Sequence, residues 1–99
     1  MKYVLRLYIT AQSGHSERAV RNLRAICESA LAGRYDLEVI DVLEDPNRAD
    51  QDKVLATPTL IRRLPLPTRR LVGDLSDRAR VIAALDIEPD DTRGEGGAK

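Results

Sequence analysis

The side chains that most often carry out catalysis are scarce in this 99-residue sequence. It contains one cysteine, Cys27, and one histidine, His15. One cysteine cannot form an internal disulfide or a cysteine-rich metal site, and one histidine does not by itself indicate a metal site or a Cys/His pair. The chemistry left to consider is that of a reactive thiol, which needs a lowered pKa of the kind that a helix N-terminus provides.

The segment Ala56-Thr57-Pro58-Thr59-Leu60 resembles the proline turn that precedes the third strand of thioredoxin-like domains. In oxidoreductases of that fold, this turn faces a Cys-x-x-Cys motif at the start of the first helix. Here that position holds Ala11-Gln12-Ser13-Gly14, and the chain has no Cys-x-x-Cys motif. Cys27 lies about three turns into the predicted helix, on its apolar face, as a small buried hydrophobic residue would. The sequence therefore argues against a redox enzyme.

Other catalytic patterns are also missing. The acidic residues in DLSD and DVLEDP have the positions of helix caps rather than of a paired general acid and base. Gly14 and Gly73 are isolated and form no glycine-rich phosphate loop. We expect His15 to be a polar loop residue near a helix start. The sequence predicts a protein that is not an enzyme and that needs no metal or cofactor.

The composition favours protein partners over nucleic acid or a membrane. Sixteen basic and 16 acidic residues give a net charge of zero, and the only aromatic residues are 3 tyrosines, so a basic or base-stacking surface is not expected. The basic residues are 13 arginines and 3 lysines, and arginine suits ion pairs at protein interfaces. No apolar run approaches membrane-spanning length, and the N-terminus runs directly into a strand pattern. We predict a cytoplasmic protein.

The first half of the chain predicts a β-α-β unit. Residues 3–9, YVLRLYI, have the pattern of a central strand covered on both faces, and residues 35–43 predict a second strand. Between them, apolar residues recur at three- and four-residue steps from Ser16 to Leu31, which predicts an amphipathic helix. Ser16 is the expected N-cap and Gly33 the expected stop. The crossover length fits a right-handed parallel unit.

The second half predicts a short helix, a hairpin and a closing helix. Asp45 is a good N-cap before the first-turn residue Pro46. Residues 59–64 and 68–73 predict two antiparallel strands, and residues 76–87 predict a helix capped by Ser76. The order β-α-β-α-β-β-α is that of an α/β, thioredoxin-like fold.

We expect a single domain over residues 1–87. Residues 88–99 are too polar and glycine-rich to pack, so we expect a disordered tail. Within the domain, RRLPLPTRR places four arginines on the hairpin. They indicate either docking onto an acidic protein surface or a device that deters edge-to-edge strand pairing, and the composition favours neither.

With these features in place, the chain is similar to the KaiB family of circadian clock proteins. The matching segments are LRLYI at 5–9, SERAVRNL at 16–23, YDLEVIDVLEDPNRADQDKVLATPTL at 35–60 and LPLPTRRLVGDLSDRARVIAALDI at 64–87. The resemblance implies a metamorphic protein. Its ground state, β-α-β-β-α-α-β, self-associates, usually as a tetramer. In a rarer fold-switched, thioredoxin-like state, the resemblance implies that the monomer binds the N-terminal ATPase ring of KaiC and modulates its phosphorylation cycle and signalling output. The bound monomer would also capture KaiA and displace a clock histidine kinase.

The resemblance places the fold switch in about residues 46–87. The residues it assigns to the switch are Pro58, Pro65, Pro67, Gly73, Asp74, Ala84 and Asp86. Isomerisation of X–Pro bonds takes tens to hundreds of seconds, so a change of isomer would help to set a slow rate. Clock members tend to have IGLD where this chain has Ala83-Ala84-Leu85-Asp86. Glycine to alanine in a helix interior gains roughly 1 kcal/mol, so we predict that the thioredoxin-like monomer is favoured here.

The resemblance also assigns a ring-binding surface on the first helix, the second strand and the hairpin. Its residues would be Arg18, Arg21, Tyr35, Asp36, Arg62, Arg69 and Arg70, and we expect them to share one face. Cyanobacterial relatives have lysine where this chain has Glu38, which puts KaiA capture in doubt. Two alternatives stay open: a thioredoxin-like sensor domain of the clock histidine kinase type, and a stress-response KaiB homologue without a KaiA partner.

Overall fold

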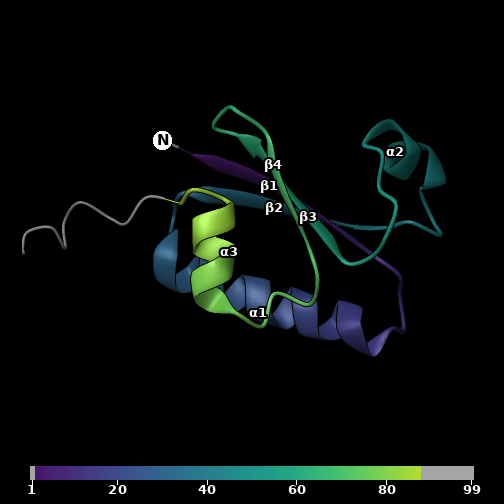
Figure 1. The fold of residues 1–99 in the computed structure, drawn as a ribbon, viewed down its shortest axis with the longest axis horizontal. Coiled ribbons are helices and arrows are strands. Elements are labelled where there is room, and N and C mark those ends of the chain that lie inside the picture. The colour runs from purple at the N-terminus through teal and green to yellow at the C-terminus, as the bar shows by residue number, and fades with distance from the viewer. Residues whose placement is uncertain (1, 88–99) are drawn as a thin grey trace, which may run out of the picture.

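The computed structural model describes residues 2–87 as a four-stranded sheet, in the order β2-β1-β3-β4, with helices on both faces (Figure 1). The elements are β1 (Tyr3–Ile9), α1 (Gly14–Ala30), β2 (Tyr35–Asp41), α2 (Pro46–Gln51), β3 (Thr59–Leu64), β4 (Arg69–Val72) and α3 (Arg78–Ala84). β1 is parallel to β2 and antiparallel to β3, and β4 is antiparallel to β3. The predicted thioredoxin-like order is confirmed. The predicted tail lies outside the described residues.

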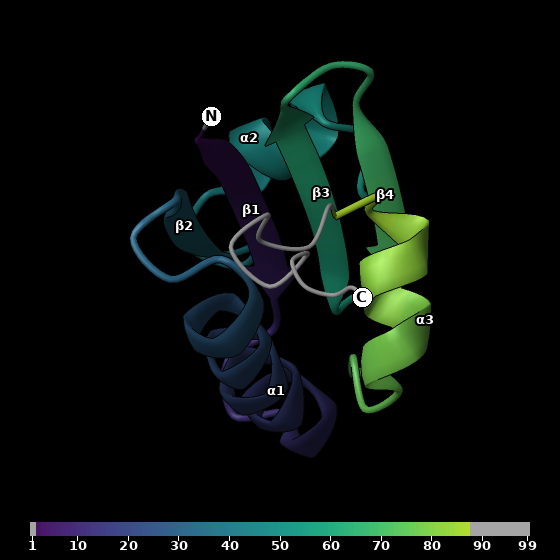
Figure 2. The same cartoon turned by 90° about the vertical axis from the view of Figure 1, so that its left-hand side faces the viewer.

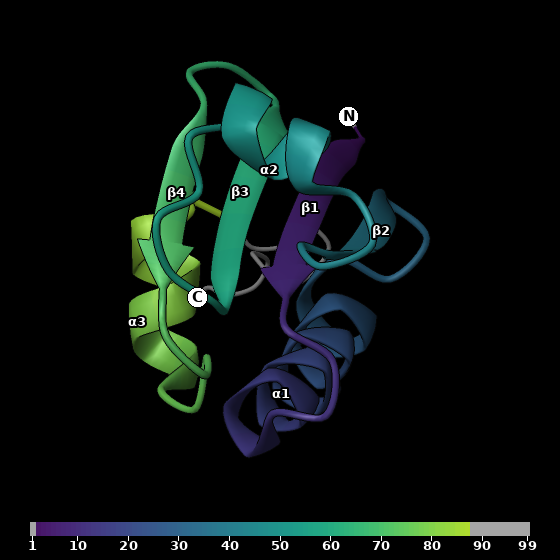
Figure 3. The same ribbon diagram turned by 90° about the vertical axis from the view of Figure 1, so that its right-hand side faces the viewer.

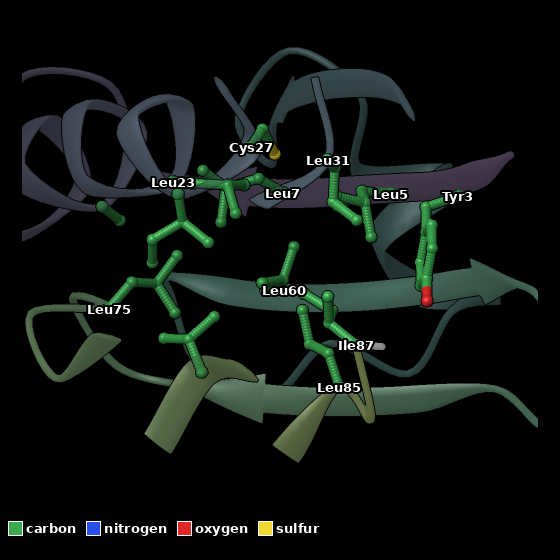
Figure 4. Packing of buried hydrophobic residues seen from close by; sticks show 13 residues of the cluster. Tyr3, Leu5, Leu7, Leu23, Cys27, Leu31, Leu60, Leu75, Leu85 and Ile87 are labelled. Atoms are coloured by element: carbon green, nitrogen blue, oxygen red, sulfur yellow. The ribbon is translucent and has the colours of Figure 1, made fainter. Parts of the chain in front are cut away.

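The central strand is covered on both faces, as predicted. α1 and α3 lie on one side of the sheet and α2 on the other (Figures 2 and 3). The larger apolar cluster lies under α1 and α3 and contains Leu5 and Leu7 of β1, Leu23 and Cys27 of α1, and Leu60 of β3 (Figure 4). A smaller cluster under α2 consists of Tyr8, Ile40, Ala49 and Ile61. None of the helices in residues 2–87 is both long and apolar enough to cross a membrane.

Two helix caps differ from the predicted ones. The N-cap of α1 is Ser13, whose hydroxyl accepts from the Ser16 amide at 3.4 Å, and Ser16 itself is buried, with its Oγ accepting from the Thr10 amide at 3.1 Å. The prediction was wrong because Gly14 and His15, which open the helix, precede its apolar repeat. Asp77, not Ser76, caps α3 by accepting from the Arg80 amide at 3.1 Å. The predicted Asp45–Pro46 start of α2 is confirmed.

The end of α3 is a Schellman-type turn. Leu85 is the C-cap, and Asp86 has a left-handed φ of 54°. The Asp86 amide donates to the Ala83 carbonyl at 3.1 Å, and the Ile87 amide donates to the Ile82 carbonyl at 3.0 Å. Ala84 is therefore the last helical residue, so its advantage over glycine is smaller than at the interior position that the sequence pattern suggested.

The hairpin of β3 and β4 pairs Thr59 with Val72 and Arg62 with Arg69. The peptide bonds preceding Pro58, Pro65 and Pro67 are cis. Gly73 directly follows β4 and has a φ of 135°, which residues with a side chain rarely adopt. Its amide donates to the Pro58 carbonyl at 3.0 Å. The proline turn and the end of the hairpin are thereby joined.

Candidate functional site

This chain has no thiol at the position where a thioredoxin carries its Cys-x-x-Cys motif. The Oγ1 atoms of Thr10, after β1, and Thr57, in the proline turn, lie 2.7 Å apart. Cys27 is fully buried on the core face of α1, and burial, followed by the charge of Glu28, raises its thiol pKa to about 11. Such a thiol stays protonated at neutral pH, and only a thiolate is a good nucleophile. No three His, Cys, Asp or Glu side chains in residues 2–87 are grouped to hold a metal ion.

The residues that the KaiB resemblance assigns to ring binding do not share one face. Arg18 and Arg21 lie exposed on α1, Tyr35 and Asp36 begin β2, and the third group lies on the hairpin. Because β2 and β4 form opposite edges of the sheet, the β2 residues and the β4 residues cannot form one continuous patch. The expectation of a single surface is wrong for this arrangement of the chain.

Arg62 is not on the surface at all. It is 2% exposed, and its guanidinium donates to the backbone carbonyls of Leu85, Asp86 and Pro67. Side chains alternate between the two faces of a strand, so Arg62 points toward α3 while Arg63 points toward α2. We therefore leave Arg62 out of the binding surface. Nothing in the repeated arginines of the sequence distinguishes the two.

The edge of the sheet at β4 carries the remaining hairpin arginines. The Arg70 guanidinium donates to the carbonyls of Asp52 at 2.6 Å and Lys53 at 3.2 Å, which ties the loop after α2 to the edge strand. Leu55 in that loop is 98% exposed, and Val72 of β4 is 50% exposed. We call Leu55, Arg69, Arg70 and Val72 the β4 edge; Arg70 and Val72 project from one face of the strand and Arg69, which pairs with Arg62, from the other. Exposed apolar side chains beside arginines are typical of protein-binding surfaces, and the sequence analysis missed the two apolar members.

At the opposite edge, Glu38 of β2 is engaged by α2. Arg48 donates to its two carboxylate oxygens at 2.5 and 2.7 Å. These hydrogen bonds lower the pKa of Glu38, while its slight desolvation acts in the opposite direction. The glutamate at this position therefore belongs to a bidentate ion pair that joins β2 to α2.

A second group of polar contacts centres on Asp52, just after α2. Its carboxylate accepts from the Tyr8 hydroxyl, from Arg6 at 3.0 Å and from Arg63 at 3.4 Å. Desolvation raises the pKa of Asp52, but the hydrogen bonds from Tyr8 and Arg6 outweigh it, and the net pKa is lowered. Asp52 therefore fastens the end of α2 to β1 and β3 as an ionised carboxylate.

Asp74 joins α1 to the segment that leads into α3. Its carboxylate lies 3.5 Å from Nε of Arg18 and accepts from the Ser76 amide at 3.1 Å, and its carbonyl accepts from Asn22 at 2.9 Å. The hydrogen bonds from Ser76, followed by those from Arg18, lower its pKa. Of the predicted switch residues, Asp74 is thus one that contacts the first half of the chain directly.

The fold and the absent thiols define a thioredoxin-like domain without the redox motif. The N-terminal domain of SasA from Synechococcus elongatus has the same fold, with a TM-score of 0.70 and 23% identity, covering 89% of this chain and 87% of that one. Chloroplastic thioredoxin z matches with a TM-score of 0.69 and 18% identity, over 88% of this chain and 80% of that one.

Sequence comparison identifies the family. The KaiB domain model matches residues 6–87. Circadian clock protein KaiB3 of Synechocystis sp. is 47% identical over 89 residues, covering 90% of this chain and 87% of that protein. Circadian clock oscillator protein KaiB of Synechococcus elongatus is 51% identical over 85 residues, covering 86% and 83%. The chain belongs to the KaiB family of circadian clock proteins.

Proposed function

We propose that the protein binds the N-terminal ATPase ring of a KaiC-type protein as a thioredoxin-like monomer and thereby modulates its phosphorylation cycle and signalling output. The observation that carries this proposal is the combination of KaiB family membership with a thioredoxin-like second half. That arrangement corresponds to the state in which KaiB-like proteins bind the ring. The protein then acts by binding rather than by catalysis, which agrees with the buried, protonated Cys27.

The β4 edge is the part of the molecule that we propose for ring contact. Arg69 is exposed and makes no ion pair within residues 2–87, so its guanidinium is free for a carboxylate. Arg70 donates to backbone carbonyls and has no carboxylate partner among the described residues. Arginine binds carboxylates in a bidentate manner, and the exposed Val72, on the Arg70 face of β4, and Leu55, in the loop that Arg70 contacts, add apolar area.

Three further partner assignments belong to the same proposal. A clock histidine kinase with a sensor domain of this fold would compete for the ring. Capture of KaiA is proposed to be weak, because Glu38 brings a negative charge to the β2 edge and is held there by Arg48. A tetrameric ground state, the domain limits of 1–87 and a cytoplasmic location stay predictions.

The test is a binding titration of the full chain on an immobilised KaiC N-terminal ATPase ring. The double variant R69E/R70E should weaken binding by about tenfold or more, as expected for central arginines of an interface. R78E/R80E is the matched control, because it makes the same charge change at exposed positions of α3. An equal loss in both variants, or none in R69E/R70E, would contradict the assignment of the β4 edge. No binding by the unaltered chain would contradict the proposed function itself.

A further inference from the structure

Arg62 is a buried cation that contacts only neutral groups in the described part of the chain. Its side chain is 2% exposed, it makes no ion pair with any residue in the described range 2–87, and its Nε has no hydrogen-bond partner. Burying an unpaired charge is costly, so such a residue needs strong compensation from its other contacts. The role of the Arg62 side chain can therefore be inferred from the groups that it contacts.

The compensation comes from two segments that lie far apart in the sequence. One terminal nitrogen of Arg62 donates to the Leu85 carbonyl and, at 3.4 Å, to the Asp86 carbonyl, both at the end of α3. The other terminal nitrogen donates to the Pro67 carbonyl in the hairpin connection at 2.6 Å. Figure 4 shows Leu85 and Ile87 lying against Leu60 of β3. Arg62 projects from the same face of the strand, because it follows Leu60 by two residues.

The end of α3 supplies acceptors that have no other partner in the helix. The last carbonyls of a helix lack intrahelical donors and carry its partial negative charge, which a cation stabilises. In the Schellman-type turn, the amides of Asp86 and Ile87 satisfy the carbonyls of Ala83 and Ile82. The carbonyls of Leu85 and Asp86 are left to Arg62.

We propose that Arg62 is a conformational capping residue that selects the thioredoxin-like arrangement of the second half of the chain. Its acceptors come together only when residues 78–84 form a helix that ends beside the hairpin connection. Any arrangement in which this segment is not that helix leaves the guanidinium without these partners. Arg62 therefore lowers the free energy of one arrangement selectively, and its importance for a fold switch rests on the proposed function.

The test is amide hydrogen exchange of R62M, which keeps much of the side-chain volume but removes the donors. We expect the amides of Leu85, Asp86 and Ile87 to exchange faster by about tenfold or more, as for lost hydrogen bonds to a charged group, with β1 and α1 much less affected. R63M is the matched control, because Arg63 is the next residue of β3, has a side chain that is 42% exposed and makes one long contact with Asp52. It should leave those three amides unchanged.

Unchanged exchange at the end of α3 in R62M, or an equal loss of protection in all elements, would overturn the proposal. If R62M does not fold, R62K decides in the same way, because lysine keeps the charge but cannot reach both segments with a planar fork. Binding of R62M to the KaiC ring separates the two proposals. If R62M releases α3 selectively but binds the ring as before, the capping role of Arg62 is supported. The proposal that the ring binds the thioredoxin-like arrangement would then be contradicted.

Discussion

The first half of the chain, from β1 to β2, contributes most of the buried apolar side chains, whereas the second half, from α2 to α3, consists of shorter elements that combine apolar burial with polar contacts. β1 and β2 have 7 residues each and α1 has 17, while α2, β3, β4 and α3 have 6, 6, 4 and 7. α1 buries Ala19, Leu23, Ile26 and Cys27 among others, but α3 buries one helical residue, Val81.

The polar contacts of the second half are directional. Arg62 caps α3, Asp74 joins the segment before α3 to α1, and Asp52 fastens the end of α2 to the sheet. Hydrogen bonds depend strongly on distance and angle, so each of these contacts is sensitive to the position of its segment. Apolar burial is less selective. That the second half, from about residue 46, switches its fold stays a prediction that rests on the family resemblance.

The largest effects should come from truncating one buried leucine in each half. Leu23→Ala and Leu85→Ala each remove a fully buried side chain, at a cost of about 2–5 kcal/mol of unfolding free energy. Leu23→Ala should lower protection throughout the molecule, whereas Leu85→Ala should release α3 and the hairpin before β1 and α1. Hydrogen exchange of both variants checks this. Uniform loss of protection in Leu85→Ala would remove the distinction between the halves.

The next largest effect concerns the contribution of Asp52 to stability at low pH. The folded pKa of Asp52 lies below the unfolded value of about 3.9, so its contribution to stability is present above that pH and is lost as the pH falls through the folded pKa. Asp52→Asn should cost about 1–3 kcal/mol at pH 7 and less near pH 3. Urea unfolding at both pH values measures this. Asp50→Asn, at an exposed position of α2, is the control, and equal costs of Asp52→Asn at both pH values would contradict the prediction.

A smaller effect should follow from changing the last turn of α3 in opposite directions. Asp86→Gly should stabilise this turn by about 0.5–1 kcal/mol, because glycine accepts the left-handed φ of 54° without strain. Ala84→Gly should destabilise α3 by up to about 1 kcal/mol. Thermal unfolding together with exchange at Ile87 measures both. A change in stability of the same sign in both variants would mean that this turn does not determine the stability of the second half.

The smallest expected effect is at Cys27. Burial and a thiol pKa of about 11 predict that a thiol reagent labels the native protein much more slowly than the protein in urea. Cys27→Ser should leave ring binding unchanged. Rapid labelling of the native protein, or loss of binding in this variant, would favour a thiol-dependent function after all.

Most of the fold could be predicted from the sequence because its apolar repeats are regular. The strand at 3–9, the helix that contains Leu23 and the hairpin are confirmed, since each follows from periodicity and turn residues. The helix ends were less well predicted, because Ser13 and Ser16 are equally good caps and tertiary contacts decide between them. For Ser16, the deciding contact is with the Thr10 amide, outside the helix.

The site was less predictable than the fold. Arg62 and Arg63 are adjacent and chemically identical, yet one is buried against three carbonyls and the other contacts Asp52. Strand alternation shows that they face opposite sides, but not which side the later helix α3 covers. Likewise, the two groups at β2 and β4 seemed to share a face until the strand order separated them.

Whether the chain is a thioredoxin-like monomer in solution is tested most directly by size-exclusion chromatography with light scattering over a concentration series, combined with NMR of the same samples. We expect a monomer whose spectra show Thr59 paired with Val72 and residues 78–84 helical. A tetramer with another pairing of these segments would contradict it, because burial at the subunit interface would then outweigh the contacts that hold the thioredoxin-like second half.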